Sequence, residues 1–283
     1  MNMQELDAYL KEYNTRELFY KEYHLAKQNP LQYKKFTDSI DLEFVKKNKI
    51  IIPELNFHFD SYTFLEDDIF NNEDLTTIVF KHDRYTPVFT HKHTFFEILY
   101  IYSGHCIQNI MGDRILLKEG DVCILSPDAE HSVEVFDESI VINILVRKST
   151  FDNIFSEILD DDNILASFFT KILYTRSYNN YIIFRTNNST TVRMSIKHIF
   201  IESLEIRKYS NKMLNYVLLI LFVNLLRGKK STVELPAELR KSNQYLSDIL
   251  IYIQNNYKTV TLEELSHTFN FTISHLSRLI KLH

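Results

Sequence analysis

The amino-acid sequence predicts an α+β protein with a β-barrel in its first half, a helical region after the barrel and a small all-α unit at the end. Three observations support this fold class. Short apolar runs with strand periodicity alternate with turn residues over residues 57–146. Helical periodicity dominates residues 150–227, apart from one possible strand over 181–185. Two short amphipathic segments separated by a tight turn close the chain.

The N-terminal segment, residues 1–55, precedes the predicted barrel and is expected to be mostly helical. Leu6, Tyr9, Leu10 and Tyr13 recur at the spacing of one helix face. Proline interrupts the pattern at residues 30 and 53, where a helix interior would lose a backbone hydrogen bond. We therefore expect several short helices here.

The barrel is predicted over residues 56–148. Three of the four glycines of the chain lie among its apolar runs, and the pair Gly112-Asp113 has the chemistry of a two-residue hairpin turn. The spacing of these runs suits consecutive hairpins. The predicted strands span residues 75–80, 95–102, 105–111, 115–117, 122–125, 132–136 and 140–146.

A set of histidines and a carboxylate is the main chemical feature of this region. His91, His93 and Glu97 are separated by even offsets, so on an extended strand they share one face, while Tyr100 and Tyr102 lie on the other. A later strand can bring His131 beside them. The sequence predicts that the barrel interior is a small-molecule pocket, mostly apolar with a few polar groups. The predicted ligand-binding residues are His91, His93, Phe95, Glu97, Leu99 and His131.

These residues carry a resemblance to a known family. The pattern HxHxxxExxxxxxG from His91 to Gly104 resembles the first motif of the cupin β-barrels, and GDVCILSPDAEH resembles the second. The second motif is most similar to the sensor barrels of the AraC/XylS family of bacterial transcription regulators. Tyr85 and Ala129 stand where glycines are usual. The resemblance implies a cupin-type sensor barrel that works without metal, so we expect no metal and no cofactor.

The C-terminal region, residues 235–283, has the spacing of a helix-turn-helix. A first helix is predicted over 245–256. Thr261 and Glu264 form a capping box that opens a second helix, with Leu262 and Phe269 among its inward residues. Ser274 is predicted to cap a third helix. The string TLEELSHTFNFTISHLSRLIK resembles the first of two helix-turn-helix units in AraC/XylS regulators, which implies a DNA-binding domain that is truncated at the end of this chain.

The outward face of the third helix supplies the candidate DNA contacts. Arg278 suits bidentate contact with guanine. For Arg278 and Lys281 the alternative is a solvated helix face near a C-terminus, where cations are favoured in any case. The predicted DNA-binding residues are Ser274, His275, Ser277, Arg278 and Lys281.

The helical region, residues 149–234, contains the string MLNYVLLILFVNLL, which is apolar on nearly every side and must be buried on several of them. One interpretation is that it packs beneath the barrel. The other, favoured by the resemblance to dimeric regulators, is a two-fold dimer interface within residues 194–226. The string LRGKKSTVELP is the predicted linker to the DNA-binding region. The predicted interface residues are Ile199, Leu214, Leu218, Leu221 and Leu225.

Composition limits the location and the partners of the protein. The net charge is −5, but the last 44 residues hold five Lys and Arg against three Asp and Glu. A basic tip on an acidic body would orient the protein on DNA and give weak non-specific affinity. The start of the chain lacks a signal pattern, the longest apolar run is too short for a membrane span, and two cysteines suit a reducing compartment. We expect a cytoplasmic protein.

These observations together predict a ligand-responsive transcription regulator that binds promoter DNA, a small-molecule effector and a second copy of itself, and is not an enzyme. One alternative is a metal-dependent cupin enzyme, an oxygenase or isomerase with His91, His93, Glu97 and His131 as ligands. Another is an interaction protein that dimerises without binding DNA. Other catalytic motifs, such as G-x-S-x-G, are absent from the sequence.

Overall fold

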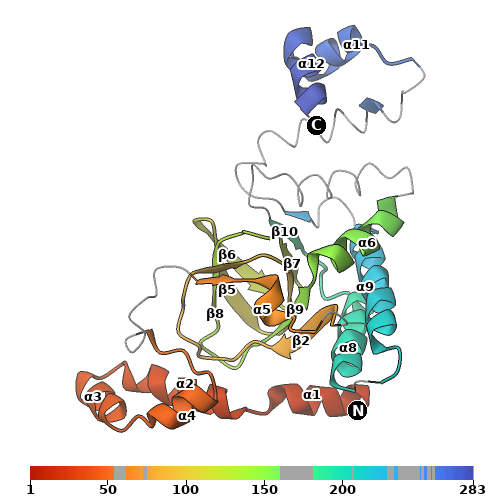
Figure 1. The fold of residues 1–283 in the computed structure, drawn as a ribbon. Coiled ribbons are helices and arrows are strands. Elements are labelled where there is room, and N and C mark those ends of the chain that lie inside the picture. The colour runs from red at the N-terminus through yellow and green to blue at the C-terminus, as the bar shows by residue number, and fades with distance from the viewer. Residues whose placement is uncertain are drawn as a thin grey trace.

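The computed structural model confirms the α+β fold class (Figure 1). Two β-sheets face each other and form a barrel, with helices against one of them. The structure describes residues 1–53, 62–72, 75–159, 181–205, 207–227, 233–234, 249, 252–253, 256 and 259–282. No helix in these residues is long and apolar enough to cross a membrane.

The barrel consists of a five-stranded sheet, with order β1-β3-β8-β5-β6, and a six-stranded sheet, with order β11-β10-β7-β4-β9-β2. The predicted bounds of β7 and β9 match, and the other predicted strands differ by a few residues at their ends. The strands are β1 (Tyr62–Phe64), β2 (Thr77–Lys81), β3 (His91–His93), β4 (Phe96–Ser103), β5 (His105–Ile110), β6 (Asp113–Lys118), β7 (Val122–Leu125), β8 (His131–Glu134), β9 (Ile140–Val146), β10 (Tyr181–Phe184) and β11 (Val233–Glu234).

The barrel extends beyond the predicted boundary at residue 148. Strand β10 pairs with β7, and β11 pairs with β10, so both belong to the six-stranded sheet. Strand β11 lies within the string that the sequence suggested as a linker. The region from 149 to 234 therefore contributes two strands to the six-stranded sheet. A two-residue strand is too short to show strand periodicity, which is why the sequence did not reveal it.

Turn chemistry connects the strands, although one predicted turn is shifted. Ile110 and Asp113 face each other across the β5–β6 hairpin, so its two central residues are Met111 and Gly112. Both have positive φ, 52° and 90°, as a type I′ turn requires. The turn therefore lies one residue before the pair Gly112-Asp113.

Backbone conformation explains the glycines of the motifs. Gly120 has φ +88°, and a Cβ atom there would lie 2.6 Å from the backbone of Asn188. Tyr85, which stands where a cupin glycine is usual, keeps a left-handed φ of 64°. Burial and a 2.7 Å hydrogen bond from its N–H to the carbonyl of Val135 hold it there. Tyr85 therefore adopts the left-handed conformation that a glycine would allow at this position.

The two faces of the six-stranded sheet enclose different cores. Phe96, Ile98, Tyr100 and Tyr102 of β4 face outward into a core shared with the helices. Leu99, between them, faces the barrel interior. Tyr100 and Tyr102 therefore lie on the face opposite Leu99 and Glu97, as strand alternation predicts.

Helices cover the outer face of this sheet (Figure 1). An aromatic stack joins three elements: the Phe96 ring lies 3.7 Å from that of Phe151, which lies 5.3 Å from that of Phe222. The helices involved are α1 (Met3–Lys11), α6 (Lys148–Leu159), α8 (Thr190–Leu204) and α9 (Ser210–Leu226).

This packing corrects the predicted dimer interface. The five residues proposed for it are at most 3% exposed and belong to the core between the helices and the sheet. Helix α9 is apolar on several sides because it contacts α8 and the chain's own sheet. Its solvent-facing side instead exposes Met213, Tyr216 and Ile220. The residues that the sequence assigned to a partner are Ile199, Leu214, Leu218, Leu221 and Leu225.

The N-terminal segment is helical, as predicted, and each of its helices begins at an Asn or Asp cap. Pro30 opens the third helix and does not break one. Glu17 fixes the segment to the barrel, because its buried carboxylate pairs with Arg84 at 2.8 Å and Lys81 at 2.7 Å. On the predicted face of α1, Leu6 and Leu10 are buried, whereas Tyr9 is 45% exposed and its ring contacts that of Phe200. Besides α1, the helices of this segment are α2 (Thr15–Ala26), α3 (Pro30–Asp38) and α4 (Leu42–Lys47). A further short helix, α5 (Glu66–Ile69), follows β1.

The C-terminal residues contain two helices, α11 (Leu262–Phe269) and α12 (Ile273–Leu282), joined by a turn with Asn270 at φ 57°. Thr261 caps α11 through the N–H of Glu264 at 3.2 Å, but the Glu264 carboxylate accepts from Tyr252. Thr272 caps α12, not Ser274 as predicted. Leu262 is 39% exposed, so its predicted inward position is wrong. Most of the helix predicted over 245–256 lies outside the described residues.

Candidate functional site

The predicted polar cluster forms at one end of the barrel, although not on a single strand. His91 and His93 belong to β3 in the five-stranded sheet, whereas Glu97 belongs to β4 in the six-stranded sheet. The chain crosses from one sheet to the other between His93 and Phe96. His131 of β8 lies directly opposite His91. The motif therefore brings its side chains together because the chain changes sheet between β3 and β4. Strand alternation predicted the correct neighbours, but it assumed that all of them lie on one strand.

The cluster is centred on the Glu97 carboxylate. Its Oε2 lies 3.0 Å from Nε2 of His93 and 3.3 Å from Nε2 of His131. Its Oε1 accepts a 2.7 Å hydrogen bond from the amide of Asn143. The rings of His91 and His131 are 4.1 Å apart. Glu97, His93 and His131 are each at most 3% exposed, so these contacts are shielded from solvent.

Each imidazole has its Nδ1 committed to a backbone carbonyl two residues away. A carbonyl oxygen only accepts, so Nδ1 carries the proton and a neutral ring has its lone pair at Nε2. Nε2 of His91 is thereby available as an acceptor or ligand, whereas Nε2 of His93 and of His131 faces the Glu97 carboxylate oxygen, which only accepts, and bonds to it only as Nε2–H. The acceptors are the carbonyls of Phe89 for His91 at 3.3 Å, of Phe95 for His93 at 2.7 Å and of Ala129 for His131 at 3.0 Å.

The pKa values of Glu97 and His91 are both lowered in this cluster, for different reasons. Burial raises the pKa of Glu97, but the close approach of His131 and His93 outweighs burial and holds that pKa well below its usual range. Burial, together with the neighbouring His131, lowers the pKa of His91 to about 3. At neutral pH the carboxylate is therefore ionised and His91 is neutral.

The same donors fit a metal ion. One ligand atom each from His91, Glu97 and His131 lies within 4.8 Å of the others. Two imidazoles and a carboxylate suit a divalent transition metal, and Nδ1–H bonds to carbonyls are the outer support that metal-bound histidines commonly have. Such an ion would act as a Lewis acid at this end of the barrel.

The other two predicted pocket residues flank the cluster. The Phe95 ring stacks on His93 at 4.5 Å and packs with Phe70 and Leu145. Leu99 lies further inside the barrel. All six residues predicted from the sequence are therefore near one another.

Sequence reasoning missed two buried amides deeper in the barrel, Gln108 and Asn143. Gln108 is 0% exposed, and Asn143 is 5% exposed. In β5, Gln108 points to the same side as the inward residues Cys106 and Ile110, because residues two apart in a strand share one face. A polar residue at an inward phase of a strand was the available signal.

The predicted DNA contacts lie on α12 with mixed exposure. Ser274 and Arg278 are exposed. His275 is half-buried, because its ring stacks 5.0 Å from that of Phe271, and Ser277 is half-buried as well. The side chain of Lys281 lies outside the described residues. Among the described side chains of this face, Arg278 is an exposed cation.

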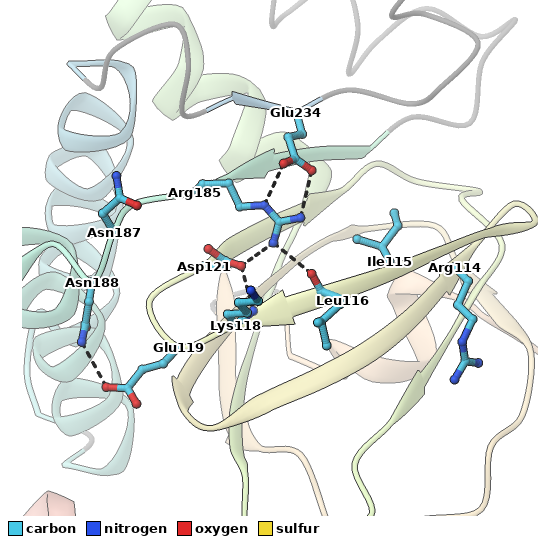
Figure 2. A pocket seen from close by; sticks show the side chains of 10 residues that line it. All are labelled: Arg114, Ile115, Leu116, Lys118, Glu119, Asp121, Arg185, Asn187, Asn188 and Glu234. Carbon is cyan, nitrogen blue, oxygen red and sulfur yellow. Dashed lines mark hydrogen bonds and ion pairs between the residues drawn. The ribbon is translucent and has the colours of Figure 1, made fainter.

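A hollow of about 670 Å³ lies away from the Glu97 cluster, between β6, the end of β10 and β11 (Figure 2). Arg185 spans it. Its guanidinium pairs with Glu234 of β11 at 2.9 Å and also contacts Asp121 and the carbonyl of Leu116. The ion pairs of Arg185 fasten β11 to the barrel, and they balance the charge of the arginine within the hollow.

Comparison with known proteins gives a family match over the barrel. Residues 78–176 match the family model of the AraC-like ligand binding domain. No curated protein sequence matches the chain. Among solved structures, a ligand-free point variant of ToxT from Vibrio cholerae strain SCE256 is similar at 14% identity, covering 73% of this chain and 75% of that chain, with a TM-score of 0.40.

Two further structures are similar at lower TM-scores. ToxT from Vibrio cholerae O395, bound to a naphthalenyl butenoic acid, has 11% identity over 72% of this chain and 93% of its own, with a TM-score of 0.34. KdgF from Halomonas sp. has 23% identity over 25% of this chain and 68% of its own, with a TM-score of 0.23. The family match is therefore one of similarity: residues 78–176 match an AraC-like ligand binding domain, and the described strands within them belong to a cupin-type barrel.

Proposed function

We propose that the protein is a ligand-responsive transcription regulator. The observation that carries the proposal is the match of the barrel to an AraC-like ligand-binding domain, together with a buried polar cluster in that barrel. A small-molecule effector would bind inside the barrel, near Glu97 and its histidines. Its binding would alter how the C-terminal helices engage promoter DNA.

The support for DNA binding comes from α11 and α12. The turn at Asn270 and the buried contact of Leu265 with Leu276 give the pair a helix-turn-helix arrangement. The second helix of such a pair enters the major groove, and Arg278 is exposed on it. One such unit per subunit neutralises few phosphates. We therefore expect the 283-residue chain alone to bind in the non-specific range of roughly 10⁻⁴ to 10⁻⁶ M at physiological salt.

The test is a fluorescence titration of the chain against its own promoter region and a scrambled duplex. Arg278→Ala should weaken binding to both duplexes several-fold, because in the non-specific range the arginine contributes by neutralising a phosphate. Lys208→Ala, on the exposed α8–α9 turn, is the control and should leave binding unchanged. Equal effects of the two variants would contradict the assignment of α12 as the recognition helix.

The effector is expected to act on a homodimer, and the outer side of α9 is the surface that suits a second copy. Met213, Tyr216 and Ile220 are each more than half exposed and repeat at the spacing of one helix face. A two-fold axis would place this stripe against its own copy. Ile220→Asp should give a monomer by light scattering, whereas Leu31→Asp, at an exposed position of α3, should not. A monomeric native chain would contradict the proposal.

The donor geometry of His91, Glu97 and His131 also supports a second candidate, a metal-dependent cupin enzyme. Elemental analysis distinguishes the two. A regulator without metal should carry well below one equivalent of Fe, Mn, Ni or Zn as purified. Near-stoichiometric metal that is lost in His91→Ala, and kept in the exposed control His105→Ala, would favour the enzyme.

A further inference from the structure

Helices α3 and α4 of the N-terminal segment carry a basic surface on an acidic chain. Residues 27–49 hold six lysines against three Asp and Glu, whereas the whole chain has a net charge of −5. Five of these lysines are exposed, and among the described residues their side chains form no ion pair. They lie on or directly after the two helices. The five are Lys34, Lys35, Lys46, Lys47 and Lys49.

The packing of this segment turns the lysines away from its own core. The ring of Phe36 from α3 lies 5.3 Å from that of Phe19 in α2, and the ring of Phe44 from α4 lies 6.1 Å from the same Phe19. These rings belong to a small apolar cluster between the helices. Figure 1 shows α3 at the outer end of the segment. The charged side of α3 and α4 is therefore the side that faces solvent.

Each of the two helices also exposes a leucine beside its lysines. Leu31 of α3 is 75% exposed, more than any other large apolar side chain that the structure describes, and Leu42 of α4 is 57% exposed. Leu31 precedes Lys35 by four residues, and Leu42 precedes Lys46 by four. Residues four apart lie on one helix face. The same pairing of an apolar and a cationic side chain thus occurs on both helices.

A partner for this surface has to satisfy two kinds of side chain. The lysines attract an anionic surface, because they have no counter-charge of their own. The leucines stabilise a complex only if they leave water for an apolar phase. The phosphate backbone of DNA offers the charge without the apolar phase. A bilayer with anionic headgroups offers both, since lysines contact the headgroups while apolar side chains enter the boundary with the acyl chains.

The kind of cation favours a bilayer over a protein partner. Residues 27–49 contain no arginine. Protein interfaces are enriched in arginine and depleted in lysine, because the planar guanidinium fixes the geometry of its bonds. A lipid headgroup layer requires no fixed geometry, so the point charge of lysine is sufficient.

We propose that α3 and α4 form a peripheral binding surface for a bilayer that contains anionic lipid. Leu31 and Leu42 lie at the boundary between headgroups and acyl chains, and the lysines contact the headgroups. The contact is reversible, because each lysine near such a surface contributes only about fivefold to binding. It does not depend on the proposed function, since the barrel and the C-terminal helices take no part in it.

Co-sedimentation of the full chain with vesicles tests this surface. The vesicles contain phosphatidylcholine alone or with about 30% phosphatidylglycerol, at a salt concentration of about 0.1 M. The native chain should bind the vesicles with phosphatidylglycerol and be released at about 0.5 M salt, because salt screens exposed charges. Equal binding to both kinds of vesicle, or binding to neither, would overturn the proposal.

Paired lysine variants locate the surface. Lys35→Gln combined with Lys46→Gln should lower vesicle binding by at least about tenfold, since two lysines are lost. Lys208→Gln combined with Lys212→Gln is the matched control, because both lysines are exposed and lie near the exposed ring of Tyr209. The two pairs change the net charge equally, so the control should keep nearly all of its binding. An equal loss in both would mean that net charge alone attracts the chain to the vesicles.

A paired leucine variant separates a bilayer from DNA. Leu31→Ser combined with Leu42→Ser keeps every charge, and it should lower vesicle binding several-fold because the apolar contact is lost. The same variant should bind a scrambled DNA duplex as the native chain does. Unchanged vesicle binding in the leucine variant would contradict the proposal. So would a lysine variant that loses affinity for the duplex and keeps its affinity for vesicles, which would assign α3 and α4 to DNA.

Discussion

The two faces of the six-stranded sheet differ in how their side chains are satisfied. On the outer face, Phe96, Phe151 and Phe222 stack in a core with helices of the same chain. On the inner face, Asn143 leaves a buried polar atom unpaired, and so does Gln108 on the five-stranded sheet across the barrel. The outer face therefore contributes stability, whereas the inner face retains groups that cost stability. Buried polar residues without partners are therefore better candidates for function than the packed aromatic residues of the outer face.

The largest expected effect is on the outer face. Phe222→Ala should lower the free energy of unfolding by about 3–5 kcal/mol, because it removes a stacked ring from a close-packed core. Leu31→Ala, at an exposed position of α3, should change it by less than about 0.5 kcal/mol. Urea denaturation measures both. Similar losses in the two variants would contradict the assignment of Phe222 to the close-packed core.

A smaller effect is expected at the centre of the inner cluster. Glu97→Gln keeps the shape of the side chain and removes its charge, so the contacts with His93 and His131 weaken. The free energy of unfolding should fall by about 1–3 kcal/mol. Glu130→Gln, in the exposed turn before β8, serves as the control. If Glu97→Gln is more stable than the native chain, the cluster is not held by that carboxylate.

Acid should weaken the inner cluster from the histidine side as well. The pKa of His91 is lowered in the folded state to about 3 from a normal value of 6.5, so folding favours its neutral form. Its contribution to stability is full above pH 6.5 and is lost as the pH falls toward 3. Between pH 6.5 and 4.5 the native chain should lose about 1–2 kcal/mol more than His91→Gln. Parallel stability curves for the two proteins would contradict the lowered pKa.

The sequence predicted much of the barrel because strand alternation and turn residues are local signals. The bounds of β7 and β9, the outward position of Tyr100, and the gathering of Glu97 with the histidines all follow from such signals. The change of sheet between β3 and β4 was not predicted, because a single periodic pattern does not show where a chain leaves one sheet for the other.

Other features depend on packing, and the sequence misassigned them. Helix α9 is apolar on several sides, but only the structure distinguishes Leu218, which faces the sheet, from Ile220, which faces solvent. Gln108 was overlooked because its unpaired amide becomes apparent only once the neighbouring strands close around it. Strand β11 is defined by its pairing with β10 and by the ion pair of its Glu234 with Arg185, both of which join residues far apart in the sequence.

The smallest expected effect tests the contrast between the two faces most directly. In the absence of ligand, Gln108→Leu should leave the free energy of unfolding within about 1 kcal/mol of the native value, or raise it, because the amide has no hydrogen bond to lose. Urea denaturation of the two proteins side by side measures this difference. A loss above about 2 kcal/mol, approaching that of Phe222→Ala, would mean that Gln108 is a structural residue of the core and that the barrel interior is built for stability and not for a ligand.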